Sequence, residues 1–84
     1  MRDITIYTTE PCGFCNQVKS LLRKRGLEYV EINLSKDPAG RTQLALRTGM
    51  MTFPQVVVGE RLIGGFAELY AADRNGELNE LLAA

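Results

Sequence analysis

The sequence predicts an α/β fold in which a four-stranded mixed β-sheet is flanked by helices, in the order β-α-β-α-β-β-α. Three observations support this prediction. Apolar and polar residues alternate in residues 4–8 and 27–34, as in strands that bury one face. Between these segments apolar residues recur at helical spacing. Later in the chain, mostly β-branched residues fill two short segments, 55–58 and 61–63, which only two residues separate.

The first three predicted elements form a β-α-β unit. In the predicted helix Val18, Leu21 and Leu22 recur on one face, and the run ends at Gly26. Two strands connected through a helix in this way lie parallel, and the crossover is right-handed. We therefore expect residues 4–8 and 27–34 to be parallel neighbours in one sheet.

A second helix is expected over residues 39–47, followed by a hairpin. Pro38 suits the first helical position, Leu44 would face the core, and Gly49 would end the helix. Gly59-Glu60 is a two-residue link of the kind that joins antiparallel strands.

Two short helices are expected to close the chain, over residues 67–73 and 78–82. Gly64-Gly65 ends the hairpin before them, and Asn75-Gly76 separates one helix from the other. Four leucines are expected to be core contacts, namely Leu69, Leu78, Leu81 and Leu82.

Length and composition predict one small domain, residues 1–84, with an ordinary hydrophobic fraction of 45%. Ten basic residues balance ten acidic ones, so neither a nucleic acid nor an anionic membrane is an expected partner. Met1-Arg2-Asp3 leads directly into the first predicted strand, which leaves no room for a signal peptide, and no apolar run approaches membrane-spanning length. The expected location is the reducing cytoplasm, where a dithiol is used catalytically rather than structurally.

The two cysteines, Cys12 and Cys15, lie three residues apart between the first strand and the first helix. We expect Cys12 at or just before the first helical turn, where unpaired N–H groups and the helix dipole favour a thiolate. A zinc site would need four ligands, and the chain has no histidine, although carboxylates or a second chain could complete it. A structural disulfide across so short a loop would stabilise little, and Gly13 argues against two unrelated core cysteines. The favoured interpretation is a redox motif.

A C-x-x-C at the first βα turn of this element order is the thioredoxin-like arrangement. Three stretches, in order and at the expected separations, resemble the signature stretches of glutaredoxins: Tyr7-Thr8-Thr9-Glu10-Pro11-Cys12-Gly13-Phe14-Cys15, Thr52-Phe53-Pro54-Gln55 and Gly64-Gly65-Phe66-Ala67-Glu68-Leu69-Tyr70. The resemblance covers essentially the whole chain. It implies glutathione-dependent reduction of disulfides and of protein–glutathione mixed disulfides, with Cys12 as the nucleophile and Cys15 as the resolving thiol.

The resemblance also implies a set of glutathione-binding residues: Phe14, Arg41, Thr52, Phe53, Pro54, Gly65, Phe66, Ala67 and Glu68. In this family the proline at position 54 is cis and faces the dithiol, so that Phe53 would offer its N–H and C=O to the cysteinyl part of glutathione. A strand-start proline is the structural alternative. The N–H groups of Phe66, Ala67 and Glu68 open a helix that could hold the γ-glutamyl carboxylate. Glu68 stands where the family usually has aspartate.

Other positions depart from the family pattern. Thr9 stands where the family often has lysine, so anchoring of the glycyl carboxylate would fall to Arg41, which could equally be a plain surface arginine. The middle pair of the motif is Gly13-Phe14 rather than the commoner Pro-Tyr, and the glycine loosens the turn. Lys19 could assist Cys12, although a solvated helix lysine is the commoner case.

Three functions remain open at this point. The leading one is a monomeric glutathione-dependent oxidoreductase acting on oxidised or glutathionylated proteins such as ribonucleotide reductase. The second is a redoxin that receives electrons from thioredoxin reductase and passes them to ribonucleotide reductase, which Thr9 favours slightly and the Pro54 and Gly65 stretches disfavour. The third is an iron–sulfur carrier in which Cys12 and glutathione from two protomers hold a [2Fe–2S] cluster. Gly13-Phe14 resembles that branch of the family, which usually has serine in place of Cys15. No other metal site is expected.

Overall fold

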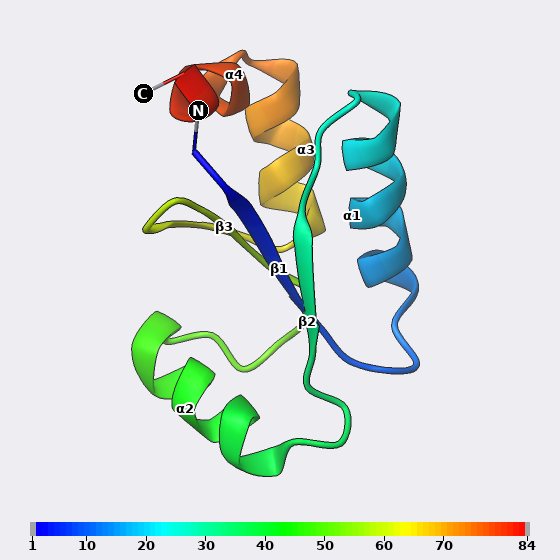
Figure 1. Ribbon diagram of the computed structural model, residues 1–84, viewed down its shortest axis with the longest axis vertical. Coiled ribbons are helices and arrows are strands. Elements are labelled where there is room, and N and C mark those ends of the chain that lie inside the picture. The colour runs from blue at the N-terminus through cyan, green and yellow to red at the C-terminus, as the bar shows by residue number, and fades with distance from the viewer. Residues whose placement is uncertain (1, 84) are drawn as a thin grey trace.

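A computed structural model describes residues 2–83 of the chain (Figure 1). The elements follow the expected order: β1 (Ile4–Thr8), α1 (Gly13–Lys24), β2 (Val30–Asn33), α2 (Pro38–Thr48), β3 (Gln55–Val58), β4 (Arg61–Gly64), α3 (Phe66–Arg74) and α4 (Glu77–Ala83). None of the helices in the described range is long and apolar enough to cross a membrane.

The four strands form one mixed sheet in the order β2-β1-β3-β4. β1 and β2 are parallel, as the helical connection between them predicts. β3 is antiparallel to β1 and also to β4, so β3 and β4 form the expected hairpin. The strand that leads to the dithiol therefore lies in the middle of the sheet, with a hydrogen-bonded neighbour on each side.

β2 is shorter than the alternation of residues 27–34 predicts, because the ladder with β1 pairs only from Val30 to Asn33. The N–H of Leu27 instead donates to the carbonyl of Leu22 at 2.9 Å, which fastens this residue to the end of α1. Leu27 and Tyr29 pack against the core without joining the sheet. The apolar pattern thus predicted the parallel pairing correctly but overextended the strand, and two apolar residues that do pair, Val30 and Ile32, are exposed.

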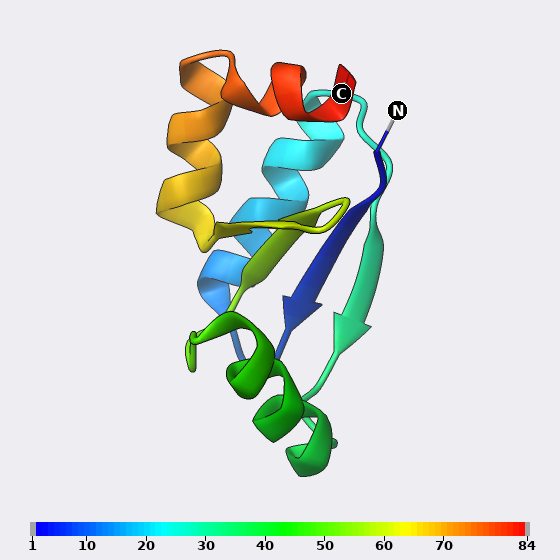
Figure 2. The ribbon, with the colours of Figure 1, turned by 90° about the vertical axis from the view of Figure 1, so that its left-hand side faces the viewer.

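The hydrophobic core lies between the sheet and the helices α1 and α3, which both cover the same face (Figures 1 and 2). Alternate residues of β1 and β3 point into it, and Ile6 and Val56 are fully buried there. The closing helices add three buried leucines, Leu69, Leu78 and Leu82. Leu81 is partly buried and packs against the same cluster.

At the C-terminal ends of α1 and α3, a bidentate ion pair connects the two helices. Nε and Nη2 of Arg25 donate to the carboxylate of Asp73, with the shortest distance 2.8 Å. This pair holds the pKa of Asp73 below its ordinary value, chiefly through the hydrogen bond from Arg25.

Helix α2 lies beyond the ends of β1 and β2 rather than over the sheet (Figures 1 and 2). It begins at Pro38, after Asp37 accepts a hydrogen bond from the N–H of Gly40 at 2.9 Å, and it ends at Gly49, whose φ is 76°. Leu44 is buried, as expected, whereas Leu46 is 82% exposed. α2 is thus attached to the rest of the fold mainly through one buried side chain and the segments at its two ends.

Candidate active site

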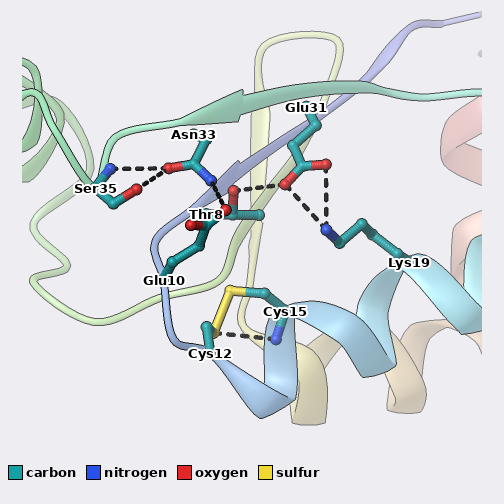
Figure 3. A network of polar contacts seen from close by, with 8 residues as sticks. All are labelled: Thr8, Glu10, Cys12, Cys15, Lys19, Glu31, Asn33 and Ser35. Carbon is teal, nitrogen blue, oxygen red and sulfur yellow. Dashed lines mark hydrogen bonds and ion pairs between the residues drawn. A yellow bond between two sulfur atoms is a disulfide. The ribbon is translucent and has the colours of Figure 1, made fainter.

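The dithiol lies at the start of α1, where Cys12 is the N-cap residue and has an extended backbone, as the sequence predicts. The two sulfurs are joined in a disulfide, and the Cα atoms of the pair are 5.3 Å apart (Figure 3). The N–H of Cys15 donates to the sulfur of Cys12 at 3.1 Å. One of the unpaired N–H groups at this helix start therefore points at sulfur.

The two cysteines differ in how far solvent reaches them. Cys15 is only 2% exposed in the first turn of α1, whereas Cys12, which immediately precedes the helix, is half-buried. A substrate sulfur approaching from outside would meet Cys12 first. A charge-assisted hydrogen bond from the helix start also favours the thiolate form of that residue once the disulfide is reduced.

Behind the dithiol, a polar network joins β1, β2 and α1 (Figure 3). The hydroxyl of Thr8, which is 1% exposed, donates to Glu31 at 2.8 Å, and Lys19 donates to both carboxylate oxygens of Glu31, the closer at 3.1 Å. The hydrogen bond from Thr8, followed by the interaction with Lys19, holds the pKa of Glu31 below its ordinary value. Lys19 is thus part of an ion pair rather than a freely solvated residue, and sequence reasoning assigned no role to Thr8 or Glu31.

A second set of hydrogen bonds holds the loop between β1 and Cys12. Asn33 at the end of β2 donates to Glu10 at 3.0 Å and accepts from the N–H and hydroxyl of Ser35 (Figure 3). Between the two networks lies a cleft of about 410 Å³, which Thr9, Cys12, Cys15, Lys19 and Glu31 line among others. Within residues 2–83, no group of three or more His, Cys, Asp or Glu side chains is arranged to hold a metal ion.

The second signature stretch forms the loop that precedes β3. The Phe53–Pro54 peptide bond is cis, as the resemblance implies, and so is Glu10–Pro11 in the loop before the dithiol. Pro54 is buried, Phe53 is half-buried and Thr52 is exposed. Gln55, which is 1% exposed, donates to the carbonyls of Met50 and Thr52, each at 3.1 Å. Sequence reasoning missed this side chain, which fixes the loop that carries Phe53.

The third stretch forms the start of α3, whose N-cap is Gly65. The N–H of Gly65 donates to Glu68 at 2.7 Å, so this carboxylate caps its own helix. Gly64 has a φ of 126°, and a Cβ placed there would lie 2.9 Å from Cγ of Glu68. A Cβ on Gly65 would lie 3.5 Å from the carbonyl oxygen of Pro54, which shows how closely the second and third stretches approach. Ala67 in the first turn is exposed.

An aromatic contact completes the connection between the three stretches. The rings of Phe14 and Phe66 stack with their centroids 6.1 Å apart, which places the start of α3 beside the start of α1. The structure thus connects Phe14, two residues after Cys12, to Phe66 at the start of α3, and the backbone of Gly65 there lies close to that of the buried Pro54.

Arg41 lies on α2 and does not line the cleft that contains Cys12 and Cys15. One of its Nη atoms donates to the carbonyls of Leu34 and Ser35, at 2.6 and 3.0 Å. The side chain also lines a cleft of about 600 Å³ together with Phe53. Thr9 lines the other cleft, beside Cys12. Sequence analysis considered Thr9 and Arg41 together as positions for binding the glycyl carboxylate, but the structure places them in different clefts.

Comparison with known proteins identifies the family. Residues 4–63 match the family model described as glutaredoxin. The chain is 39% identical to a glutaredoxin of Pseudomonas aeruginosa over 84 residues, which is the full length of both chains. The chain belongs to the glutaredoxin family. It is also 37% identical to glutaredoxin 3 of Escherichia coli over 82 residues, covering 98% of this chain and 99% of that relative.

Solved structures agree with this glutaredoxin in fold. The solution structure of a Brucella melitensis glutaredoxin is 40% identical and superposes with a TM-score of 0.85, covering 98% of this chain and 89% of that one. The crystal structure of a buckwheat glutaredoxin–glutathione complex is 29% identical with a TM-score of 0.87, covering 98% of this chain and 77% of that one. The predicted thioredoxin-like fold is confirmed. Glutaredoxins are thiol–disulfide oxidoreductases, so Cys12 and Cys15 form a redox-active pair, as the motif and its position predict.

Proposed function

We propose that this glutaredoxin uses glutathione to reduce disulfides and protein–glutathione mixed disulfides, with Cys12 as the nucleophile and Cys15 as the resolving thiol. The observation that supports it most is the asymmetry of the pair, since Cys12 is accessible and accepts an N–H from the helix start while Cys15 is 2% exposed. The buckwheat relative, which shares the fold, was solved as a complex with glutathione.

On a glutathionylated protein the reaction takes two exchanges. The Cys12 thiolate attacks the glutathionyl sulfur, the mixed disulfide breaks, and the protein sulfur leaves as a thiolate that takes a proton from solvent. A second glutathione, as its thiolate, then attacks the glutathionyl sulfur on Cys12. Glutathione disulfide is released and the Cys12 thiolate is regenerated. The second glutathione is the reductant: its sulfur is oxidised to the disulfide level as the protein sulfur is reduced to a thiol, and the glutathionyl sulfur stays at the disulfide level throughout.

On a protein disulfide Cys15 completes the first half of the reaction. Cys12 attacks one sulfur and forms a bond to the substrate, and the deprotonated Cys15 then attacks the sulfur of Cys12. The substrate leaves as a dithiol and the Cys12–Cys15 disulfide remains, which is the oxidised form that the structure contains. Two molecules of glutathione would reduce it again. The 5.3 Å between the two Cα atoms allows this bond to form within one helical turn.

Glutathione would lie beside Cys12, between the loop that carries Phe53 and the start of α3. The backbone of Thr52 and Phe53 would pair with its cysteinyl part, Phe14 would flank the sulfur, and the first turn of α3 would bind the γ-glutamyl carboxylate. One carboxylate oxygen of Glu68 caps α3, and the other would bind the ammonium group of glutathione. Arg41 supplies a cation at the cleft that it shares with Phe53.

We further propose that the protein acts as a monomer in the cytoplasm and that oxidised ribonucleotide reductase is among its substrates.

The source of electrons is the decisive test of glutathione dependence. The oxidised protein is mixed either with glutathione, glutathione reductase and NADPH or with thioredoxin reductase and NADPH, and the thiols are counted over time. We expect reduction in the first mixture only. Reduction by thioredoxin reductase alone would overturn the proposal in favour of the second candidate.

The [2Fe–2S] carrier is a separate candidate, in which Cys12 and glutathione would supply the ligands in a dimer. The absorbance spectrum of protein purified without oxygen, recorded with and without glutathione, tests it directly. Visible bands of an iron–sulfur cluster would support the carrier function as an additional activity.

A further inference from the structure

Three aromatic rings and one guanidinium form a continuous row that begins at the dithiol. The rings of Phe14 and Phe66 are 6.1 Å apart and stacked, and those of Phe66 and Tyr70 are 5.9 Å apart and tilted by 42°. Arg74 lies 5.6 Å from the centroid of the Tyr70 ring and donates to its hydroxyl at 3.0 Å. We call this row, Phe14, Phe66, Tyr70 and Arg74, the aromatic ridge.

The aromatic ridge is open to solvent for much of its length. Phe14 is 60% exposed and Tyr70 is 46% exposed, while Phe66 lies partly buried between them. Of the three rings only that of Phe66 packs against the core cluster, so the rings of Phe14 and Tyr70 do not contribute to the core. Contiguous exposed apolar surface of this kind marks interaction sites more often than isolated exposed residues do.

The far end of the ridge carries a positive charge. Among residues 2–83 three ion pairs form, and none of them includes Arg74. The two acidic residues nearest to it in the chain are engaged elsewhere, Asp73 with Arg25 and Glu77 with Arg61. The only hydrogen bond of the Arg74 side chain within this range goes to a neutral hydroxyl. A carboxylate from a partner would therefore be the complementary group here.

The spacing of the ridge matches that of an extended peptide. Side chains two residues apart on an extended chain lie on the same side, about 6.6 Å from one another. The two centroid distances of the ridge, 6.1 and 5.9 Å, are close to this repeat. The ridge also begins close to the reactive sulfur, because Phe14 lies in the first turn of α1, two residues after Cys12.

We propose that the aromatic ridge is the surface along which a polypeptide substrate lies while its disulfide, with glutathione or with a second cysteine, reacts at Cys12. It selects substrates with an aromatic or large aliphatic side chain two residues from the reactive cysteine and an acidic side chain several residues farther along. This inference rests on the proposed function, because it names the substrates of the same site. Glutathione disulfide and other small disulfides would not extend to Tyr70, so the ridge distinguishes protein substrates from small ones.

The test compares three substrates in the glutathione-coupled assay. The first is a glutathionylated cysteine peptide with Phe two residues and Asp six residues from the cysteine, made in both chain directions. The second has Ser and Asn at those positions, and the third is glutathionylated cysteine alone. With the wild-type protein we expect kcat/KM for the first peptide, in one direction, to exceed that for the second by about tenfold.

Two substitutions locate that preference on the ridge. Tyr70→Ala should remove most of it, and Arg74→Gln should remove the part that depends on Asp and on low salt. Both should change kcat/KM on glutathionylated cysteine by less than about twofold. Val30→Thr, which removes exposed apolar surface from β2, is the control and should leave all three values unchanged. Arg74 is exposed, so Arg74→Gln keeps the test valid if Tyr70→Ala lowers the melting temperature.

The outcomes separate this proposal from the one on which it rests. Turnover of glutathionylated cysteine with equal rates on the two peptides would overturn the ridge proposal and leave glutathione dependence standing. Equal losses on all three substrates in Tyr70→Ala and Arg74→Gln would do the same, and so would a dimer in solution that Tyr70→Ala dissociates. Failure of the wild-type protein on all three substrates would overturn both proposals.

Discussion

The N–H of Cys15 donates a hydrogen bond to the sulfur of Cys12 at 3.1 Å, so the sulfur proposed to react is also the N-cap of helix α1. This arrangement stabilises negative charge on sulfur without a histidine, a residue that the chain does not contain. It also ties the chemistry of Cys12 to the residue three positions later, whose own sulfur is buried.

The two cysteines are expected to have separable roles. Cys12→Ser should abolish reduction of every substrate, because the only other thiol in the chain, that of Cys15, is 2% exposed. Cys15→Ser should keep activity on glutathionylated substrates and lose the reduction of protein disulfides that proceeds through the internal disulfide. The measurement is turnover of both substrate types with each variant. If the two variants behave the other way round, the assignment of nucleophile and resolving thiol is wrong.

The Glu31 carboxylate should make stability depend on pH. Its pKa is lowered in the folded protein, chiefly by the hydrogen bond from Thr8, so it stabilises the fold above its unfolded-state pKa. That contribution is lost as pH falls through the lower, folded-state pKa. We expect the difference in unfolding free energy between wild type and Glu31→Gln to be largest at neutral pH and to vanish in acid, measured by urea titration at several pH values.

Thr8→Val is the matched control for that experiment. It removes the donor while keeping the shape of a buried side chain, so it should cost about 1 kcal/mol and reduce the pH dependence. A difference between wild type and Glu31→Gln that grows as pH falls would contradict the assigned direction of the pKa shift.

Two glycines should respond in opposite ways to alanine. Gly64 has a φ of 126° and a Cβ there would lie 2.9 Å from Cγ of Glu68, so Gly64→Ala should lower the unfolding free energy by about 1–3 kcal/mol. Gly13 is the first residue of α1 and a Cβ there meets nothing within 4 Å. Gly13→Ala should therefore raise stability by roughly 0.5 kcal/mol. Urea unfolding of both variants checks the pair, and destabilisation by Gly13→Ala would contradict it.

Gln55 is expected to hold the loop that carries Phe53. In Gln55→Leu the carbonyls of Met50 and Thr52 lose their donor inside the fold, which should cost about 2 kcal/mol. The loop would then present the backbone of Phe53 less precisely, so the KM for glutathione should rise while activity at saturation changes less. A Gln55→Leu protein with normal stability and a normal KM would show that the loop is held by other contacts.

Glutathione affinity should respond to charge at position 9, beside Cys12, and at Arg41 in the cleft that Phe53 lines. The glycyl carboxylate is fully charged and Thr9 offers only a neutral hydroxyl, so Thr9→Lys should tighten binding by several-fold, on the order of 1 kcal/mol. Arg41→Ala should weaken binding by a similar amount, and it should also lower stability, because Arg41 donates to two backbone carbonyls. Titration of the Cys15→Ser protein with glutathione at two salt concentrations is the measurement. Both binding effects should shrink as salt increases.

Local sequence pattern was sufficient to predict most of the fold. Alternation and helical spacing depend on which residues face the core, and that is why β1, α1, β3 and the buried leucines were placed correctly. The same pattern overextended β2, because Leu27 faces the core while its N–H bonds to the end of α1. Core contact and strand pairing are different properties, and hydropathy does not separate them here, because the apolar Val30 and Ile32 pair with β1 and are exposed.

The contacts that support the site were not predictable in the same way. Thr8 meets Glu31 across 23 residues of chain, and Phe14 meets Phe66 across an even longer separation. No local pattern specifies such pairs, although the position of Thr8 on the same face as Ile4 and Ile6 indicated that its hydroxyl would need a buried partner. The side chain of Arg41 is held by backbone carbonyls in the loop before α2, and the sequence does not indicate where those carbonyls point.

The placement of α2 at the end of the sheet has a consequence for motion. α1 and α3 are held together by the core and by the ion pair of Arg25 with Asp73, so their amide hydrogens should exchange with solvent only when the whole protein unfolds. α2 contributes one buried leucine, Leu44, and its amides should exchange through local opening at much lower free energy. The wall of the cleft that bears Arg41 can then adjust to ligands of different size while the dithiol stays in place.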